Sequence, residues 1–425
     1  MSSKTKTTAT KEEAKPEMVP KLRFPEFRGA EGWKSIPLSR LANRAKQKNR
    51  DEKIDRVLTN SAEFGVVDQR DFFDKDIATQ GKLEGYFVVE LGSYVYNPRI
   101  SSTAPVGPIS KNKIGTGVMS PLYTVFKFKD DRNDFYEHFF KTTGWHTYMR
   151  QASSTGARHD RMAISSDDFM AMPLPVPSPD EQQKIAECLS SVDELMAAQT
   201  RKVEALKTHK KGLMQQLFPR EGETQPRLRF PEFQNAGEWE VRKAGSLFAN
   251  RVTKGEQGLP IYSVTMHDGM VKRDSFDRNF YDIEDAAGNK KVCKYDIAYN
   301  MMRMWQGALG VAPEDCLVSP AYIVLAPMKD AVPVFFQYLF KLPATLLLLT
   351  SHSRGLTKDR LRLYYDDFAR IPLRCPAPPE QQRIASCLIS LDALITSETQ
   401  KLEALKTHKK GLMQQLFPSP EAVEA

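Results

Sequence analysis

Apolar residues recur along two long segments of the chain in alternating steps of four and three. The steps hold over more than four heptads in each segment, and polar residues interrupt them at Gln199 and Lys210 in one and at Glu398 and Lys409 in the other. A stripe of two apolar positions per heptad is typical of a coiled-coil seam. The predicted seam residues are Ile185, Leu189, Val192, Met196, Val203, Leu206, Leu213 and Leu217, and Ile384, Leu388, Leu391, Ile395, Leu402, Leu405, Leu412 and Leu416.

The ends of both segments carry helix signals. Ser178-Pro179-Asp180-Glu181 has the residues of a capping box with proline at the first helical position. In the second segment Pro379 and Glu380 remain, whereas Ala377 replaces the capping serine. Pro219 and Pro418 follow the last seam residues and stop each helix. We therefore predict spacer helices over 178–219 and 377–418, each roughly 57 Å long at 1.5 Å per residue.

Two arrangements of these helices are open. Each helix could pack on its own globular domain, or the two helices could pair with each other. Each seam is narrower than the apolar face of a helix that packs on a globular domain, which favours pairing of the two helices with each other. Because a globular body must fit between the two segments, the simplest closed form is an antiparallel pair with a pseudo-two-fold axis.

The two segments belong to a larger internal repeat. The phrase EALKTHKKGLMQQLFP stands at 204–219 and again at 403–418, 199 residues later, and LRFPEF stands at 22–27 and 228–233. The chain is therefore two tandem units whose C-terminal segments match closely while their globular parts have diverged. We infer that the two matched segments have the same function and that the two globular parts have different functions.

The globular parts contain short β-rich runs such as YFVVELGSYVYN and AYIVLAP, with helical patches between them. This pattern predicts an α+β fold, with antiparallel sheets in two globular domains joined by the two long antiparallel helices. We place the globular domains at 20–177 and 220–376. The polar segment 1–19 is read as a disordered tail, and 419–425 as a second tail.

Composition narrows the function only slightly. Hydrophobic residues make up 41% and charged residues 27% of the chain, the formal charge is +8 and the pI about 9.0. Such a balance suits a nucleic-acid partner, although many other proteins share it. The five cysteines form no C-x-x-C pair and stand beside no histidine cluster, so we expect reduced thiols and no metal site. The longest apolar run, at 342–350, is too short to span a bilayer, and we expect a cytoplasmic protein.

Two matched loops, at 153–169 and 351–368, mix Gly, Ser, Thr and Arg, a composition that suits phosphate contact. Arg99 and Arg303 follow a matched Tyr-Asn pair and are candidates for groove contact. The alternative is a surface turn whose arginines pair with neighbouring aspartates. The DNA-binding candidates are Arg99, Ser153, Ser154, Thr155, Arg158, Arg161, Arg303, Ser353, Arg354, Lys358 and Arg360.

Motifs of catalysis are missing from the sequence. It has no P-loop, no glycine-rich cofactor loop after a strand and no convincing nuclease carboxylate–lysine cluster. Tyr96-Asn97-Pro98-Arg99 lacks the second proline and the aromatic residue of the Asn-Pro-Pro-aromatic motif of amino-methyltransferases. We name no catalytic residue and no metal ligand.

The two divergent globular parts are each closed by a Pro-rich Glu-Gln-Gln segment and a long helix. These segments are PLPVPSPDEQQKIA at 173–186 and PLRCPAPPEQQRIA at 372–385, and the SSTGAR and SHSRGL loops and the GLMQQLF helix ends accompany them. The arrangement resembles the DNA specificity subunit of Type I restriction–modification systems. The resemblance covers essentially everything after the N-terminal tail, and it is specific because the whole arrangement is duplicated.

The resemblance implies that each globular part is a target recognition domain for one half of a bipartite, asymmetric site in double-stranded DNA. It implies that the two helices form a spacer and dock two modification subunits, which hold S-adenosylmethionine and methylate adenine. Restriction subunits with motor and nuclease activity would join them. This chain would be non-catalytic and would bind no cofactor itself.

Two other functions compete with this one. The duplicated seam alone would fit a coiled-coil scaffold whose globular ends bind proteins. Salt-sensitive DNA binding would separate the two, since phosphate contacts release counterions. A self-sufficient methyltransferase–nuclease fusion is disfavoured by the missing motifs.

Overall fold

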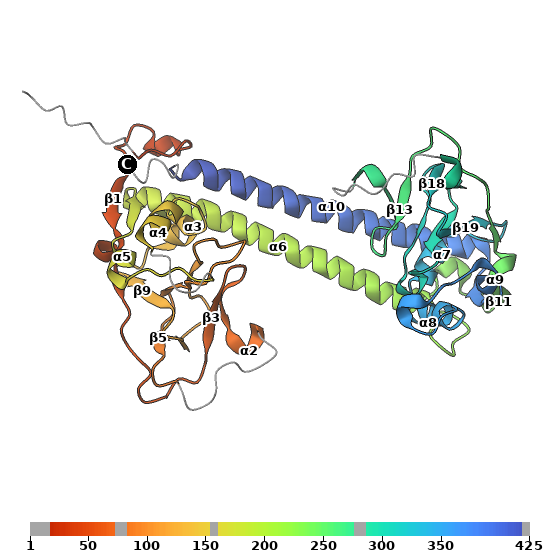
Figure 1. The fold of residues 1–425 in the computed structure, drawn as a ribbon, viewed down its shortest axis with the longest axis horizontal. Helices are drawn as coiled ribbons and strands as arrows, with labels where there is room; N and C mark the ends of the chain where they lie inside the picture. Colours follow the sequence, from red (N-terminus) through yellow and green to blue (C-terminus); the bar gives the residue numbers. More distant parts are fainter. Residues whose placement is uncertain (1–17, 73–82, 154–159, 276–285, 419–425) are drawn as a thin grey trace, which may run out of the picture. The chain divides into compact units, whose positions relative to one another are not determined.

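The computed structural model describes residues 18–72, 83–153, 160–275 and 286–418, except the side chain of residue 287. The chain forms two compact units, unit 1 comprising 1–199 with 401–425 and unit 2 comprising 200–400. Both boundaries fall inside long helices, α6 (Pro179–Leu217) and α10 (Pro378–Leu416), so each unit holds a globular body and a part of both helices (Figure 1). The two predicted helices are confirmed, and the six-segment domain division stays a prediction.

The helices pair in opposite directions within each unit. In unit 1, Ile185 and Leu416 share one core, and Asp193 forms an ion pair with Lys409. In unit 2, Lys210 pairs with Asp392 in the equivalent place, and Lys202 Nζ lies 3.0 Å from Glu398 Oε2. The lysines that interrupt the seam therefore bind carboxylates of the facing helix.

The seam is buried most deeply at its ends. Ile185, Leu189 and Leu416 belong to the core of unit 1, and Ile384, Leu388 and Leu217 to that of unit 2. Both arrangements left open by the sequence therefore hold in part. The first turns of each helix pack on their own globular body, and the seam also pairs the helices with each other.

In unit 1, the largest sheet has four antiparallel strands in the order β2-β9-β6-β7, which are Ala42–Arg44, Thr124–Phe128, Tyr94–Tyr96 and Ile109–Lys111. The described part of unit 1 also has three two-stranded sheets: β1 (Lys34–Pro37) with β10 (Pro173–Val176), β3 (Leu58–Ser61) with β4 (Gly65–Asp68), and β5 (Phe87–Val89) with β8 (Gly117–Met119). The helices of the body are α1 (Leu38–Leu41), α2 (Gln69–Phe72), α3 (Asp134–Phe139), α4 (His146–Ala152) and α5 (Ser166–Met170), with a 3-10 turn at Pro25–Phe27.

Unit 2 repeats this plan with the sheet order β12-β19-β16-β17, which are Phe248–Asn250, Tyr322–Pro327, Ile297–Asn300 and Leu309–Val311. Its two-stranded sheets are β11 (Glu240–Lys243) with β20 (Pro372–Cys375), β13 (Tyr262–Val264) with β14 (Met270–Lys272), and β15 (Lys290–Val292) with β18 (Cys316–Val318). Its helices are α7 (Pro333–Phe340), α8 (Pro343–Ser351) and α9 (Tyr365–Phe368), with 3-10 turns at Pro231–Phe233, Ala244–Ser246, Arg273–Ser275, Ala286–Gly288, Met304–Gln306 and Lys358–Arg360. The predicted α+β class with antiparallel sheets is confirmed.

A buried ion pair explains why LRFPEF and the Glu-Gln-Gln segment are both repeated. Arg23 of the first LRFPEF makes two hydrogen bonds of 2.7 Å to the carboxylate of Glu181, and Arg229 binds Glu380 in the same way. All four side chains are at most 9% exposed. Each pair fastens the start of a globular body to the first turn of its long helix, and breaking it would leave a buried charge unpaired.

The predicted capping box is therefore only half correct. Ser178 Oγ accepts from Glu181 N at 3.3 Å, as expected of the cap. The carboxylate of Glu181, however, binds Arg23. A charged, bidentate partner is worth more to a buried carboxylate than one backbone N–H.

The last turn of α10 and Phe417 complete the core of unit 1. Phe417 packs 5.2 Å from Phe135 and 6.0 Å from Phe139, measured between ring centroids. Leu22 N donates to Gln415 O at 2.9 Å. In unit 2, Phe218 and Gln216 make the equivalent contacts with Phe335 and Leu228.

No single described helix has the length and apolar composition needed to cross a membrane. Among the described helices, one pair, α7 and α8, passes that test when taken together, and it is bent by 84° at the break between the two.

Candidate nucleic-acid interface

A fixed turn follows strand β6 in unit 1 and exposes Arg99. Asn97 N donates to Pro108 O at 3.0 Å, and Asn97 Nδ2 donates to Asn60 O at 2.9 Å. Asn97 Oδ1 then accepts from Arg99 N at 3.0 Å. The backbone is thereby held while the Arg99 side chain stays 69% exposed.

A second arginine lies beside the first, although 62 positions separate them in the sequence. Met162 N donates to Pro98 O at 2.9 Å, and Ile100 N donates to Asp160 O at 3.0 Å, which brings Arg161 next to Arg99. The Nε atoms of both arginines lie 4.0 Å from Asp160 Oδ2. Two cations share one anion, so the pair keeps one net positive charge, which suits a phosphate.

The two arginines stand at a cavity of about 440 Å³. Strand β3 and the turn after β6 form part of its wall, and three aromatic residues, Phe72, Tyr86 and Tyr123, line it. Tyr123 OH lies 3.0 Å from Thr59 Oγ1. The site therefore combines cations with aromatic and hydroxyl groups, as nucleic-acid surfaces do.

Unit 2 builds the same backbone arrangement with other side chains. Leu363 N donates to Met301 O at 2.9 Å, as Met162 does to Pro98 in unit 1. Arg354 and Arg362 pair through two backbone hydrogen bonds of 2.9 and 2.8 Å. With Arg360, they line a shallow cavity of about 570 Å³.

Arg354 is held by an acidic and an aromatic neighbour. Its Nε lies 2.7 Å from Asp367 Oδ2, and its guanidinium carbon lies 5.6 Å from the ring centroid of Tyr364. The hydrogen bond from Arg354 lowers the pKa of Asp367. Part of the alternative reading of this loop, in which arginines pair with nearby aspartates, therefore applies to Arg354.

The remaining predicted residues have different surroundings. Ser153 Oγ donates to Met149 O and Ser353 Oγ donates to Leu349 O, so both hydroxyls terminate helices. Arg303 Nη1 donates to Gln306 Oε1 at 3.1 Å and does not line the shallow cavity. Lys358 lies in the 3-10 turn Lys358–Arg360. Ser154, Thr155 and Arg158 lie outside the described residues.

Sequence reasoning missed Arg362 and Asn60. Matching the two halves at a constant offset paired Arg161 with Arg360, whereas the backbone contacts to Pro98 and Met301 make Arg362 the counterpart of Arg161. The apolar–polar–apolar order of Leu361, Arg362 and Leu363, the last of which is buried, was a signal for Arg362. Nothing in the sequence marks Asn60, because its neighbours come from distant strands.

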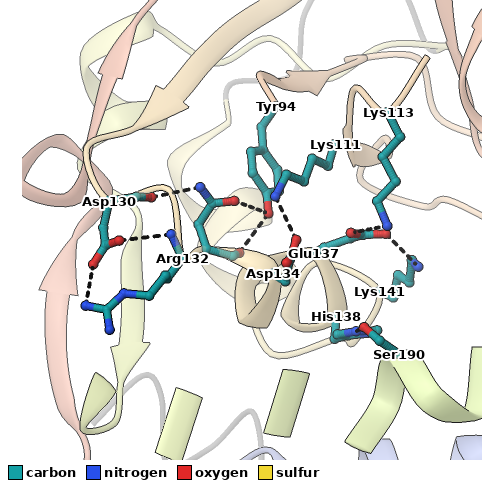
Figure 2. Close-up of polar contacts among 11 residues, drawn as sticks. Tyr94, Lys111, Lys113, Asp130, Arg132, Asp134, Glu137, His138, Lys141 and Ser190 are labelled. Carbon is teal, nitrogen blue, oxygen red and sulfur yellow. Dashed lines mark hydrogen bonds and ion pairs between the residues drawn. The ribbon is translucent and has the colours of Figure 1, made fainter. Parts of the chain in front are cut away.

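A second polar cluster ties α3 to the rest of unit 1 (Figure 2). Lys111 binds Asp134 at 2.7 Å, and Glu137 lies between Lys113 at 2.7 Å and Lys141 at 3.4 Å. His138 Nε2 lies 3.2 Å from Ser190 Oγ of α6. Because the carboxylates offset most of this positive charge, the cluster suits attachment of α3 better than ligand binding.

Burial determines the protonation state of His138, the histidine of this cluster. His138 is 2% exposed, and burial lowers its pKa to about 4. Its ring is therefore neutral at pH 7. Within the described ranges, no group of three or more His, Cys, Asp or Glu side chains is arranged to hold a metal ion.

The chain is similar to known proteins in sequence and in fold. Residues 236–407 match the family model described as the Type I restriction modification DNA specificity domain. The chain is 24% identical over 278 residues to a protein of Methanocaldococcus jannaschii named as the type I restriction enzyme MjaX specificity subunit. That match covers 61% of each chain, so this chain spans about three fifths of the relative's length.

Two solved structures share the fold. One is a Type-I restriction-modification system S subunit from M. genitalium, with 14% identity and a TM-score of 0.55, covering 95% of this chain and 100% of that one. The other comes from work on complex assembly and conformational transition of a type I R-M system, with 15% identity and a TM-score of 0.50, covering 92% and 98%.

Proposed function

We propose that this chain, which belongs to the DNA specificity family of Type I restriction–modification systems, reads a bipartite site in double-stranded DNA with one globular unit per half-site. One observation carries the proposal. Both units place arginines beside the turn that follows the matched Tyr-Asn pair, on the same backbone framework. Arginines so placed can bind phosphates and the edges of guanine bases.

The two half-sites should differ, because the two surfaces differ in chemistry. Unit 1 offers Arg99 and Arg161, which flank Asp160 and line a cavity. Unit 2 offers three arginines over a shallow surface, one of them stacked on Tyr364. Different donors and shapes favour different bases. The recognised site is therefore asymmetric.

The second part of the proposal is that the long helices bind partner subunits. The same side chains are exposed in both copies of the sixteen-residue phrase, including Lys207 and His209 in one and Lys406 and His408 in the other. Folding does not require identical exposed residues, so the repetition supports one kind of partner bound twice. These partners are two modification subunits, joined by restriction subunits, in the cytoplasm.

The chemistry in this assembly belongs to the partners. The modification subunits hold S-adenosylmethionine and methylate adenine, and the restriction subunits cleave unmodified DNA. This chain binds no cofactor and contributes no catalytic group. Its part is to choose the DNA sequence and to set the distance between the half-sites.

The test is a genome-wide map of N6-methyladenine in a host that expresses the partner methyltransferase with and without this chain. We expect a split, asymmetric motif that vanishes when the chain is removed. Unchanged methylation, with the methyltransferase shown to be active, would contradict the proposal and leave the protein-binding scaffold. Binding to site-bearing DNA should also weaken by roughly 10³-fold or more between 50 and 200 mM salt if several phosphates are contacted.

A further inference from the structure

Asn60 of strand β3 is a buried polar side chain that the fold uses only in part. It is 2% exposed, and its Nδ2 donates to Val95 O at 2.8 Å and to Pro108 O at 3.1 Å. These two bonds fix which way the amide points. Its Oδ1 is buried without a partner among the residues that the structure describes, and Asn60 is one of the residues that line the cavity of unit 1. A buried acceptor without a donor is costly, so this one is suited to a ligand that brings a donor.

Unit 2 shows that the hairpin does not need this residue. Hairpins β3–β4 and β13–β14 correspond closely, since Gly65 and Gly269 both turn with positive φ, at +68° and +69°. In this alignment Val264, 8% exposed, occupies the place of Asn60. At this position of the hairpin, unit 1 has a buried acceptor and unit 2 has none.

The rest of the cavity has complementary chemistry. Tyr86 and Tyr123 provide aromatic surface, and the Arg99–Arg161 pair keeps a net positive charge at the wall. The volume of about 440 Å³ lies within the range of small-molecule pockets, roughly 300–1,000 Å³. A planar ring with an N–H donor and an attached anion would satisfy all of these groups.

We propose that this cavity binds one nucleotide whose base carries an exocyclic amino group, turned out of the DNA half-site that unit 1 reads. The amino group of adenine or cytosine donates to Asn60 Oδ1, the ring lies against the tyrosines, and the phosphate faces Arg99 and Arg161. The inference rests on the proposed function for its DNA source. The same chemistry would also accept a free nucleotide, and the test separates the two.

The experiment uses the full chain with its modification subunits and duplexes carrying 2-aminopurine at each position of the unit 1 half-site in turn. We expect a several-fold rise in fluorescence at one position besides the methylated adenine. Leu122→Trp, at the cavity, should abolish that rise. Leu91→Trp is the matched control, because both leucines are 59% exposed and only Leu122 lines the cavity.

Asn60→Val, which copies unit 2, tests the acceptor without introducing a larger side chain. We expect about tenfold weaker binding to the natural site and no further loss when the everted base lacks its amino group. Deoxyadenosine and deoxycytidine monophosphate are titrated without DNA in parallel. Saturable binding that Leu122→Trp removes would assign the cavity to a free nucleotide.

The remaining outcomes overturn the inference. If the complex binds its site but no second position brightens and neither monophosphate binds, the cavity is not a nucleotide site, while the proposed function stands. A rise at the second position that Leu122→Trp leaves intact would mean that the everted base does not enter this cavity. If the complex does not bind DNA and neither monophosphate binds, the proposed function and this inference fail together.

Discussion

At the scale of single residues, the buried His138 makes the stability of unit 1 depend on pH. Its pKa is about 4 in the folded chain, against about 6.5 when exposed, and the charges around it are Lys141, Lys409, Glu137 and Asp193. Between these pH values the unfolded chain binds the proton more readily, so stability is complete above pH 6.5 and falls as the pH drops toward 4.

We expect unit 1 to lose about 2 kcal/mol of its free energy of unfolding between pH 7 and pH 5 through this residue. His138→Gln, which cannot titrate, should reduce the loss by that amount, and His209→Gln on the exposed face of α6 should not. The measurement is chemical denaturation of each variant at both pH values. Equal pH dependence of His138→Gln and the unmodified chain would contradict the assignment.

Substitution of Gly107 should also lower the stability of unit 1, for a steric reason. Its φ is +82°, and an added Cβ would lie 2.1 Å from the carbonyl oxygen of Asn97. Gly107→Ala should therefore displace the turn that carries Arg99 and destabilise unit 1 by more than about 1–3 kcal/mol.

Gly92→Ala is the control for Gly107→Ala. Gly92 has the same backbone conformation, φ +81°, with nothing within 4 Å of the added Cβ. It should cost only about 1 kcal/mol. Hydrogen exchange of residues 97–100 reports the difference, and equal protection in the two variants would show that the close approach to Asn97 does not matter.

Part of the residue-scale picture could not come from the sequence. Arg99 and Arg161 were predicted, since a mixed loop and an arginine after a matched pair are local signals. Ser153 and Ser353 bond to carbonyl groups four residues earlier, which is also a local contact. A segment that ends a helix in this way has the same amino-acid composition as a phosphate-binding loop, so the sequence does not distinguish the two. Asn60 was missed because its role depends on Val95 and Pro108, which lie far away in the chain.

At the scale of elements, Phe417, which follows α10, should stabilise unit 1, and Phe218, which follows α6, should stabilise unit 2. Phe417 packs on Phe135, and Phe218 packs on Phe335. Each change to alanine leaves a cavity in a core and should cost about 3–5 kcal/mol. Hydrogen exchange after Phe417→Ala should accelerate across unit 1, whereas Phe218→Ala should affect unit 2.

The outcome that would contradict this is faster exchange confined to the final turns of α10 after Phe417→Ala. Such a result would mean that Phe417 contacts unit 1 without stabilising its core. The sequence could predict the long helices because their period is sustained and their ends are capped. The short strands, many of three residues, carry too few positions to show which strands pair, so the position of β6 between β9 and β7 came only from the structure.

At the scale of the whole molecule, the proposed role of the helices is to set a DNA spacing. A heptad adds about 10.5 Å to a helix, close to three base-pair steps of about 3.4 Å. Deleting one heptad from each helix keeps the seam in register. We expect the preferred gap between half-sites to shorten by about three base pairs with both half-sites unchanged. If the shortened chain still directed methylation to sites with the original spacing, the helices would not set the distance between half-sites.

The most direct test of the whole account asks whether one unit reads one half of the site. N6-methyladenine is mapped in hosts that express the partner methyltransferase with Arg161→Ala, with Arg362→Ala or with the unmodified chain. We predict that Arg161→Ala relaxes or abolishes recognition of one half-site only, and that Arg362→Ala does so for the other. Loss of specificity in the same half from both variants, or an unchanged motif from both, would contradict the assignment of one unit to each half-site.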